Sequence, residues 1–514
     1  MIRNSIAIAF LTFVSLCAPS SVVAQLSETK IQASNGVNDD RFGWSVSISG
    51  DTAVVGARNN GAGRAYIYAR DTFGIWTEQQ ELTASDGVSG DQLGVSVSID
   101  GEYLILGADN DDTDRGSAYI FAQDPATGNW TEQEKLTASD GTSYDNFGIS
   151  VAISADTAIV GAMGSGVLPV TGYAYIFVRD PIGGSWTQQA KLTPSDGQQE
   201  DFFGYSVAID GDTALVGAIP NPAGAGSVYV FERDPGTGLW TESQELVGAG
   251  RFGESVSLNE DIAFIGANLG GGGSGTAHVF ERDPGTGIWS EIQVLSDPTG
   301  AASDYFGGSV DISSAGDVAI VGASSDGDSG LQAGSAFIYV PDDVTGVWTE
   351  VEKILASDGG AFDRFGRSVS IDGNSAIVGA STDSSRPGHA YIYTNSVAPA
   401  SPEITVTDST APADDLEVDF GDITTFTQFE HVVTVSNDGD ADLILGNVAV
   451  ADALSVPYSV SLDQCSGQTL TQGSNCNITV RFEPQSIGTF TDSFDIPSND
   501  ADESSVTVDI TGNG

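Results

Sequence analysis

One short unit recurs seven times along this 514-residue chain and constrains the fold more than any other feature. Its first copy, residues 40–57, reads DRFGWSVSISGDTAVVGA. Apolar and polar residues alternate after the Phe-Gly pair, which is the period of a half-buried strand. Gly50 and Asp51 supply a two-residue turn, and an apolar β-branched run then ends at a Gly-Ala pair. The unit predicts a β-hairpin, and its repetition decides the architecture.

Each hairpin is followed by a variable loop, a third strand such as residues 65–68, an Asp-Pro-x-x-Gly turn in most copies, and a Trp that opens a polar fourth strand. Four short strands per repeat and seven repeats predict an all-β chain whose residues 26–396 form a seven-bladed β-propeller. The landmark glycines that define the seven copies are Gly43, Gly94, Gly148, Gly204, Gly253, Gly307 and Gly366.

The two ends of the repeat array complement each other. The seventh copy stops after its third strand, residues 390–393, and lacks the Trp strand. Residues 27–36 resemble residues 349–359, which form the fourth strand of the sixth copy. We therefore expect the N-terminal segment to complete the seventh blade and close the ring, which removes exposed sheet edges.

The repeats end at residue 396. Residues 397–402 have the composition of a linker, and residues 403–514 show short alternating strands that predict an immunoglobulin-like β-sandwich. Cys465 and Cys476 are the two cysteines beyond the N-terminal segment. In an exported chain they most simply form one disulfide, worth about 2–3 kcal/mol.

Residues 1–24 have the pattern of a secretory signal, with Arg3 before an apolar stretch too short to span a bilayer and a cleavage site after Ala24. Cys17 leaves lipid anchoring open as an alternative. No later segment is apolar enough to cross a membrane, so we expect a secreted, cell-surface or periplasmic protein. A net charge of −53 argues against nucleic-acid binding and favours divalent cations or basic partners.

Two groups of acidic residues are candidate calcium sites. The first lies in the acidic loop of residues 109–114, which lacks the glycine of an EF-hand loop: Asp109, Asp111 and Asp114. The second pairs two aspartates within one loop of a repeat: Asp86 with Asp91, and Asp140 with Asp145. The alternative for the second group is that each aspartate caps its own turn.

These motifs resemble those of known families. The Phe-Gly and Gly-Ala repeat is similar to the FG-GAP repeat of the integrin α-chain propeller and of many exported bacterial proteins. Calcium-binding members carry an Asp-rich loop between the first two strands, whereas this chain has a two-residue turn, so that mode of calcium binding is not implied. Residues 418–421, 435–443 and 480–484 resemble the ASH/Hydin-type domain, often labelled choice-of-anchor D.

The loops between second and third strands vary most, and they share one face of the predicted propeller, so we expect recognition there. Three histidines and no nucleophile motif argue against an enzyme. The sequence thus predicts an exported, monomeric, non-enzymatic binding or adhesion protein for a cell-surface or matrix protein or a polysaccharide. The alternatives are a polysaccharide hydrolase or lyase with its site in the propeller mouth, and a structural envelope component.

Overall fold

The structure is a computed structural model that describes residues 25–164, 171–197, 201–219, 225–342, 345–381, 387–396, 404–409, 416–437, 443–448, 454–471, 473–500 and 505–514. The predicted signal (1–24) and linker (397–402) lie outside the described residues. The chain divides into two compact units, one formed by Leu26–Asn395 and one that contains Ser396–Gly514.

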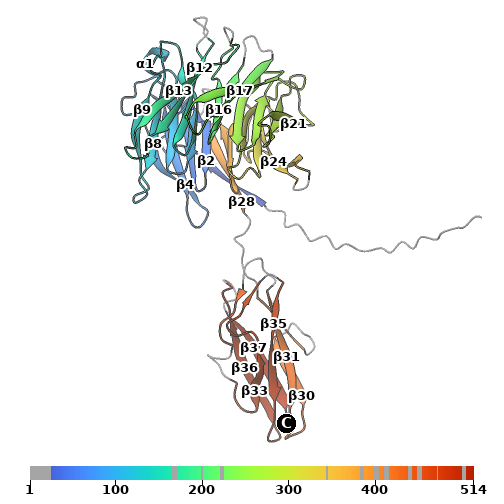
Figure 1. Cartoon of the computed structure of the whole chain (residues 1–514). Helices are drawn as coiled ribbons and strands as arrows, with labels where there is room; N and C mark the ends of the chain where they lie inside the picture. The colour runs from blue at the N-terminus through green and yellow to red at the C-terminus, as the bar shows by residue number, and fades with distance from the viewer. Residues whose placement is uncertain are drawn as a thin grey trace, which may run out of the picture. The chain divides into compact units, whose positions relative to one another are not determined.

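The first unit is the predicted seven-bladed propeller, with one four-stranded antiparallel sheet per blade (Figure 1). Blades 1 to 3 consist of β2 (Phe42–Ser49), β3 (Thr52–Ala57), β4 (Arg64–Arg70) and β5 (Trp76–Leu82); β6 (Val97–Asp100), β7 (Tyr103–Ala108), β8 (Ser117–Gln123) and β9 (Trp130–Leu136); and β10 (Phe147–Ser154), β11 (Thr157–Ala162), β12 (Tyr173–Arg179) and β13 (Trp186–Leu192). Blades 4 to 6 consist of β14 (Ser206–Asp210), β15 (Thr213–Ala218), β16 (Gly226–Arg233) and β17 (Trp240–Gly248); β18 (Phe252–Asn259), β19 (Ile262–Ala267), β20 (Thr276–Arg282) and β21 (Trp289–Leu295); and β22 (Phe306–Ile312), β23 (Ala319–Ala323), β24 (Ser335–Pro341) and β25 (Trp348–Ile354).

The seventh blade confirms the predicted closure. Its sheet has the order β1 (Gln25–Ile31), β28 (His389–Ser396), β27 (Ser375–Ala380) and β26 (Phe365–Asp372). The Glu28 carboxylate accepts hydrogen bonds from Tyr393 Oη at 2.8 Å and from the Ser357 backbone N–H at 3.0 Å. The first strand therefore joins the last blade and also contacts the sixth.

Backbone contact between neighbouring blades explains the two glycine motifs. The α-carbon of Gly107, from a Gly-Ala pair, lies against the carbonyl oxygen of Gly148, from the next blade's Phe-Gly pair, and a methyl group at Gly107 would overlap that oxygen. Ser96 Oγ donates to the same carbonyl at 2.8 Å. The glycine-to-carbonyl contact recurs at all seven junctions, including Gly379 against Gly43 where the ring closes. Phe-Gly, Ser and Gly-Ala are thus parts of one blade-to-blade contact.

Aromatic packing fills the space inside this contact. The buried Phe42 ring lies 5.5 Å from the Tyr66 ring and 6.1 Å from the Tyr68 ring, and the same arrangement recurs in other blades. In blade 5, His278 occupies the tyrosine column and lies edge-on, 5.1 Å from Phe252. His278 therefore substitutes for an aromatic ring.

The second unit is a two-sheet sandwich, and its hydrophobic core includes Val433, Ile478, Phe482, Phe494 and Ile510. One sheet has the order β29 (Ile404–Asp408), β31 (Phe429–Asn437), β35 (Asn475–Phe482) and β33 (Tyr458–Asp463); the other has β30 (Glu417–Asp422), β37 (Ser505–Asn513) and β36 (Thr489–Pro497). A short pair, β32 (Leu443–Ile444) and β34 (Thr469–Leu470), stands apart. Among the described residues, no helix is long and apolar enough to cross a membrane.

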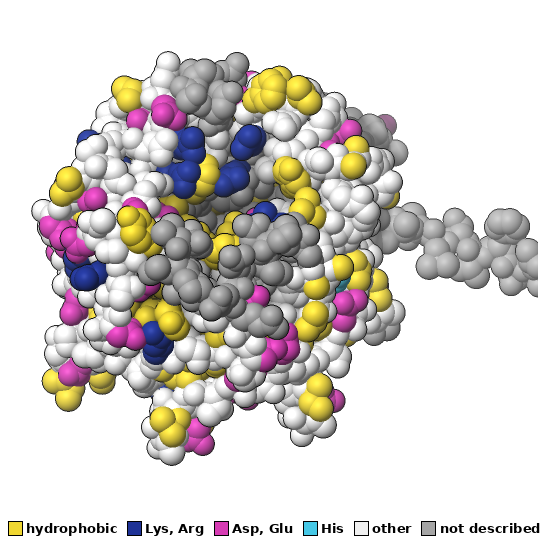
Figure 2. Space-filling view, turned by 90° about the horizontal axis from the view of Figure 1, so that it is seen from above, with side chains coloured by type: hydrophobic (Ala, Val, Ile, Leu, Met, Phe, Trp, Pro, Cys, Tyr) yellow, Lys and Arg dark blue, Asp and Glu magenta, His cyan; other side chains and the backbone are white. Residues whose placement is uncertain are grey.

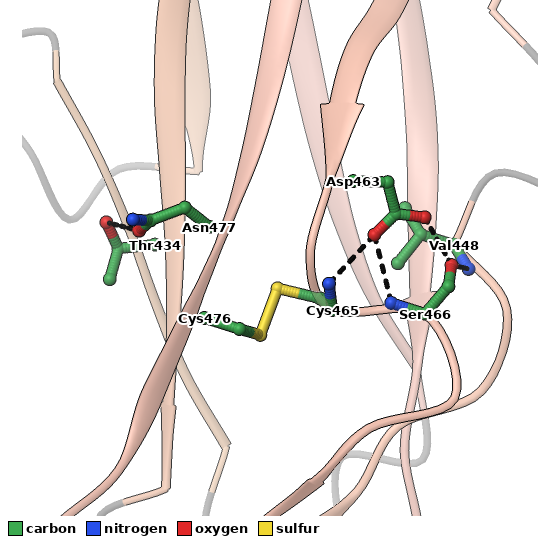
Figure 3. Close-up of a disulfide and its surroundings, with 7 residues drawn as sticks. All are labelled: Thr434, Val448, Asp463, Cys465, Ser466, Cys476 and Asn477. Atoms are coloured by element: carbon green, nitrogen blue, oxygen red, sulfur yellow. Dashed lines mark hydrogen bonds between the residues drawn. A yellow bond between two sulfur atoms is a disulfide. The ribbon is translucent and has the colours of Figure 1, made fainter.

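Cys465 and Cys476 form the predicted disulfide, with their α-carbons 5.3 Å apart (Figure 3). The Asp463 carboxylate accepts from the backbone N–H groups of Cys465 and Ser466, both at 2.9 Å, and so holds the turn that carries Cys465. The bond links this turn to β35 and closes a loop of eleven positions.

Replacing both cysteines with alanine should lower the free energy of unfolding of the sandwich by about 2–3 kcal/mol, because the loop is no longer closed in the unfolded chain. A thermal scan of the full chain measures this as a downward shift of the sandwich transition. The propeller transition is the internal control and should not move. Equal shifts of both transitions would contradict the conclusion that the disulfide stabilises the sandwich alone.

Candidate functional site

The candidate site lies at one mouth of the propeller's central channel. The first strands of all seven blades line a cavity of 360 Å³ along the axis. We call the end that carries the seven landmark glycines and α1 (Asp111–Asp114) the Phe-Gly face. Figure 2 views this face and shows Lys and Arg side chains gathered beside hydrophobic ones around a central hollow.

Three residue columns surround this mouth. Each column takes one residue from every blade. The first column precedes the Phe-Gly pair (Leu-Gly in blade 2), the middle column follows that pair, and the third column follows the Gly-Ala pair. The middle column consists of Trp44, Val95, Ile149, Tyr205, Glu254, Gly308 and Arg367. The residues on either side of the middle column take part in the blade-to-blade contact and hardly change, whereas the middle-column side chains differ in every blade. The scaffold is therefore constant from blade to blade, but the side chains at the mouth are not.

Four arginines from blades 7 and 1 form what we call the basic sector: Arg41, Arg58, Arg364 and Arg367. The guanidinium carbons of Arg58 and Arg367 lie 3.4 and 3.9 Å from the centre of the Trp44 ring, and that of Arg41 lies 5.3 Å away. Such stacking holds guanidinium groups in place through cation–π attraction. Burial, followed by repulsion from Arg41, lowers the pKa of Arg58 to about 10.

A second polar group reaches the mouth from blades 4 and 5. Tyr205 Oη donates to Glu254 Oε1 at 3.2 Å, and an Arg251 guanidinium nitrogen lies 2.9 Å from Glu254 Oε2. Burial raises the pKa of Glu254, although Arg251 opposes the shift. Burial likewise raises the pKa of Tyr205 to about 12.

Several buried polar atoms at the mouth lack a hydrogen-bond partner within the described residues. They come from the three columns: Nε of Arg41, Arg58 and Arg364, Oε1 of Gln92, Oδ1 of Asp109 and of Asn268, and Oγ of Ser381. An unsatisfied buried polar atom costs about 1–3 kcal/mol. Their concentration at one mouth therefore indicates a site prepared for a polar ligand or for ordered water.

Backbone strain is also concentrated here. The residue before each landmark Phe or Leu has a left-handed backbone, with φ between 48° and 63°: Arg41, Gln92, Asn146, Phe202, Arg251, Tyr305 and Arg364. None is glycine, and a left-handed residue of this kind costs roughly 1–2 kcal/mol. The conformation recurs at the equivalent position of every blade, so it belongs to the repeat that positions the mouth columns.

The other end of the channel has the opposite charge. Asp100, Asp210 and Asp372 end first strands there and accept backbone N–H groups from neighbouring blades. Within the wall, burial raises the pKa of Asp311 to about 6, against hydrogen bonds from Ile371, Ser257 and Ser370. The channel is thus basic at the Phe-Gly face and acidic at the other face.

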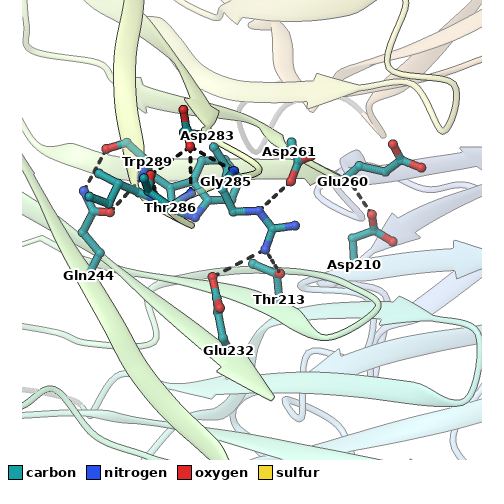
Figure 4. Close-up of polar contacts among 12 residues, drawn as sticks. Asp210, Thr213, Glu232, Gln244, Glu260, Asp261, Asp283, Gly285, Thr286 and Trp289 are labelled. Atoms are coloured by element: carbon teal, nitrogen blue, oxygen red, sulfur yellow. Dashed lines mark hydrogen bonds and ion pairs between the residues drawn. The ribbon is translucent and has the colours of Figure 1, made fainter. Parts of the chain in front are cut away.

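Figure 4 shows the acidic face between blades 4 and 5, where a cavity of 350 Å³ lies. Arg282 pairs with two of its carboxylates by donating from Nε to Asp261 at 2.5 Å and from Nη1 to Glu232 at 3.4 Å. Beside it, the Gln244 amide pairs with the Trp289 backbone at 2.8 and 2.9 Å. Five carboxylates and two arginines line this cavity, so it is an acidic junction between blades.

The aspartates predicted as calcium ligands have internal partners. In blade 2, Asp86 accepts from Tyr119 at 2.8 Å and from Lys135 at 2.7 Å. Asp91, at the other end of the same loop, accepts from the Val88 backbone at 2.5 Å. In blade 3, Asp140 accepts from Tyr175 and Lys191, and Asp145 accepts from the Thr142 backbone at 2.6 Å. The upstream aspartate in each loop pairs with lysine, and the downstream one caps its own turn.

The three aspartates of the acidic loop do not converge. Asp111 lies 2.6 Å from Lys135 Nζ and 3.1 Å from Tyr119 Oη, so it joins the Asp86 group. Asp109 points to the channel mouth instead, where burial raises its pKa to about 6 and Arg58 opposes the shift. Asp114 donates its backbone N–H to Asn110. Within the part of the chain that the structure describes, no three His, Cys, Asp or Glu side chains are placed to hold a metal.

Calcium binding remains a prediction, and Lys135 provides the test. Its ammonium occupies the position between Asp86 and Asp111 that a cation would take. If these carboxylates bind calcium, Lys135→Ala should bind it more tightly than the parent, because a competing positive charge is gone. Calorimetric titration measures this, with Lys191→Ala as the matched variant in blade 3. Absence of heat from both variants would remove the predicted site.

The same lysine sets a pH dependence. The hydrogen bond from Lys135 lowers the pKa of Asp86 below 3.8. A carboxyl whose pKa is lower in the folded state stabilises the fold above its unfolded pKa, and this contribution is lost as pH falls through the lowered value. Lys135→Ala should therefore lose less stability than the parent between pH 5 and pH 3, as measured by denaturant titration. Parallel pH profiles would refute this.

The sequence predicts recognition in the loops that follow Gly-Ala, which begin with the third mouth column, but it does not identify the other two columns. Two signals were present. The residue between Phe-Gly and Ser differs in all seven copies although its neighbours hardly change. Arginine, scarce in the whole chain, recurs beside that motif in blades 1, 5 and 7. The strained backbone and the unsatisfied atoms require the structure.

Each of the two units matches a known protein family. Six segments match the family model of the FG-GAP repeat: residues 26–68, 76–121, 130–177, 186–231, 289–339 and 348–393. Residues 413–513 match the HYDIN/CFA65/VesB-like, Ig-like domain. Most of blade 5 lies outside the matches, yet the structure forms β18 to β20 there. No curated protein matches the chain.

Two solved structures resemble this chain at low sequence identity. The periplasmic gluconolactonase PpgL of Pseudomonas aeruginosa is 16% identical, with 64% of this chain and 88% of that chain covered and a TM-score of 0.42. Sqt1 of Saccharomyces cerevisiae is 12% identical, with 78% and 94% covered and a TM-score of 0.40. Likeness at this level says nothing about activity.

Proposed function

Because the chain belongs to the FG-GAP repeat family, we propose that it is an exported binding protein whose recognition surface is the Phe-Gly face of the propeller. The observation that carries the proposal is the contrast at the channel mouth. Blade-to-blade contacts repeat seven times, whereas the middle-column side chains differ in every blade. The first and third columns leave buried polar atoms without hydrogen-bond partners among the described residues. The sandwich acts as a spacer or attachment module. The disulfide and the signal-like residues 1–24 support export.

Binding of the full chain to polysaccharides, matrix proteins and whole cells tests this proposal. Ser324→Trp adds a large ring to the column that follows Gly-Ala and should reduce binding at least tenfold. Thr77→Trp, on the exposed face of the outer strand β5, is the matched control and should bind like the parent. Equal binding by both variants, or no binding to any surface, would refute recognition at this face.

A polysaccharide-cleaving enzyme is the second candidate, and one observation favours it. Glu254 and Asp109 both reach the mouth and both have raised pKa values, which suits a general acid. Tyr205 and Arg251 hold Glu254 in place. An assay for released sugars from acidic and neutral polysaccharides, with Glu254→Gln as the inactive control, decides between the candidates.

A further inference from the structure

We infer that the basic sector of the channel mouth binds an organic carboxylate. The inference rests on the proposed binding function of the Phe-Gly face and names the chemical group bound there. Only 18 Lys and Arg residues stand against 71 Asp and Glu in the chain. Four arginines in one sector of one mouth are therefore the exception to the charge of the whole protein, and Figure 2 shows Lys and Arg side chains gathered beside the central hollow of this face.

The geometry of the arginines suits a planar anion. Guanidiniums at 3.4 and 3.9 Å from the centre of one ring are too close to share a face, so Arg58 and Arg367 lie on opposite faces of Trp44. A guanidinium donates its hydrogen bonds in its own plane, and stacking leaves those edges open. Arg58 Nε is buried and has no hydrogen-bond partner within the described ranges. Edges of this kind bind carboxylates through paired N–H donors.

The charges near the sector do not balance. Asp39 lies 3.6 Å from Arg41, and Asp109 acts on Arg58. Glu254 acts on Arg367 but is already paired with Arg251. Burial, and after it the remaining repulsion between the arginines, lowers the pKa values of Arg58 and Arg367. An added anion relieves this repulsion.

The remainder of the mouth indicates what the carboxylate is attached to. Blades 2 to 4 place apolar side chains in the three columns: Val95, Ile149, Met163, Phe202 and Ile219. A ligand with an apolar surface beside its carboxylate contacts both sectors at once. The carboxylates at the far end of the channel repel it, so the anion stays at the Phe-Gly face.

Calorimetry with matched acids and neutral analogues tests the inference on the full chain. Benzoate and galacturonate should bind, whereas benzamide and galactose should not. Arg58→Gln and Arg367→Gln should each weaken binding of the acids about tenfold or more, since a hydrogen bond to a charged group exceeds 1.4 kcal/mol. Arg58→Lys keeps the charge but loses the paired donors, so its affinity for the acids should lie between those of the parent and Arg58→Gln. Arg179→Gln, on the opposite face and paired with Asp156 at 2.6 Å, is the control.

The outcomes separate this inference from the proposed function. Tighter binding of an acid than of its neutral analogue supports the inference. The acid that binds better shows whether the mouth prefers an aromatic or a sugar ring beside the carboxylate. Equal binding of acids and neutral analogues, or parental affinity in both glutamine variants with unchanged thermal transitions, overturns it. If those variants bind the acids poorly but cells or polysaccharides normally, the carboxylate site stands and surface recognition lies elsewhere. If no acid binds but Ser324→Trp still abolishes surface binding, the proposed function stands and this inference falls.

Discussion

Deleting residues 25–31 will abolish the cooperative unfolding transition of the propeller. The deletion removes β1, leaves β28 with an open edge, and breaks the ion pair between Lys30 and Asp358 at 2.5 Å. It also removes the buried Ile31 from the core shared with blade 1. The expected loss exceeds about 5 kcal/mol, which is comparable to the whole stability of a domain. Thermal scanning and size-exclusion chromatography measure it, and the sandwich transition should persist.

A rearranged chain is the matched control for this deletion. Residues 25–36 are moved behind residue 395 through a copy of the turn at residues 234–239, which joins β16 to β17 in blade 4. The seventh blade then has all four strands in the ordinary order, so the propeller transition should return to within a few degrees of the parent. Failure of this chain to fold, or normal folding of the deleted chain, would contradict closure by β1.

Gly107→Ala should destabilise the propeller by about 3 kcal/mol, at the upper end of overpacking costs. The added methyl group would overlap both the carbonyl oxygen of Gly148 and the Oγ of Ser96, and backbone cannot move aside as a flexible side chain does. Gly107 has no left-handed backbone, so the effect isolates the close approach of the two blades.

Gly183→Ala is the control for Gly107→Ala. It lies in an exposed turn where a methyl group meets only the Asp180 carboxylate at ordinary contact distance. Its effect should be within about 0.5 kcal/mol. Urea titration measures both variants, and similar values for the two would contradict the role assigned to the blade-to-blade contact.

The fold was largely predictable because it depends on features that repeat. The strand periods, the two glycine pairs and the missing seventh Trp strand were sufficient for seven blades and their closure. In the sandwich, β33 and β36 were not predicted. Residues 458–463 and 489–497 carry Ser, Thr and Asp on exposed faces, and this dilutes the apolar alternation that identifies a strand.

The candidate site was less predictable because it depends on convergence. Arg41 and Arg58 belong to the same blade as Trp44, but Arg367 is 323 residues away in sequence and reaches the Trp44 ring only because the ring of blades closes. The predicted aspartates were read from acidity alone. Sequence did not show that Lys135 and Lys191 reach them from the outer strands, because a pairing across strands has no fixed spacing in the chain.

The Gly-Ala glycine of one blade contacts the carbonyl group of the Phe-Gly glycine in the next blade. Both are backbone groups, so the contact does not depend on which side chains lie beside it. Substitutions at the mouth therefore leave this contact in place, whereas the hydrophobic core is shared between neighbouring blades. Seven blades with three mouth columns each give twenty-one positions that vary independently of the frame. Each blade therefore adds three residues to the mouth without requiring a new backbone contact between blades.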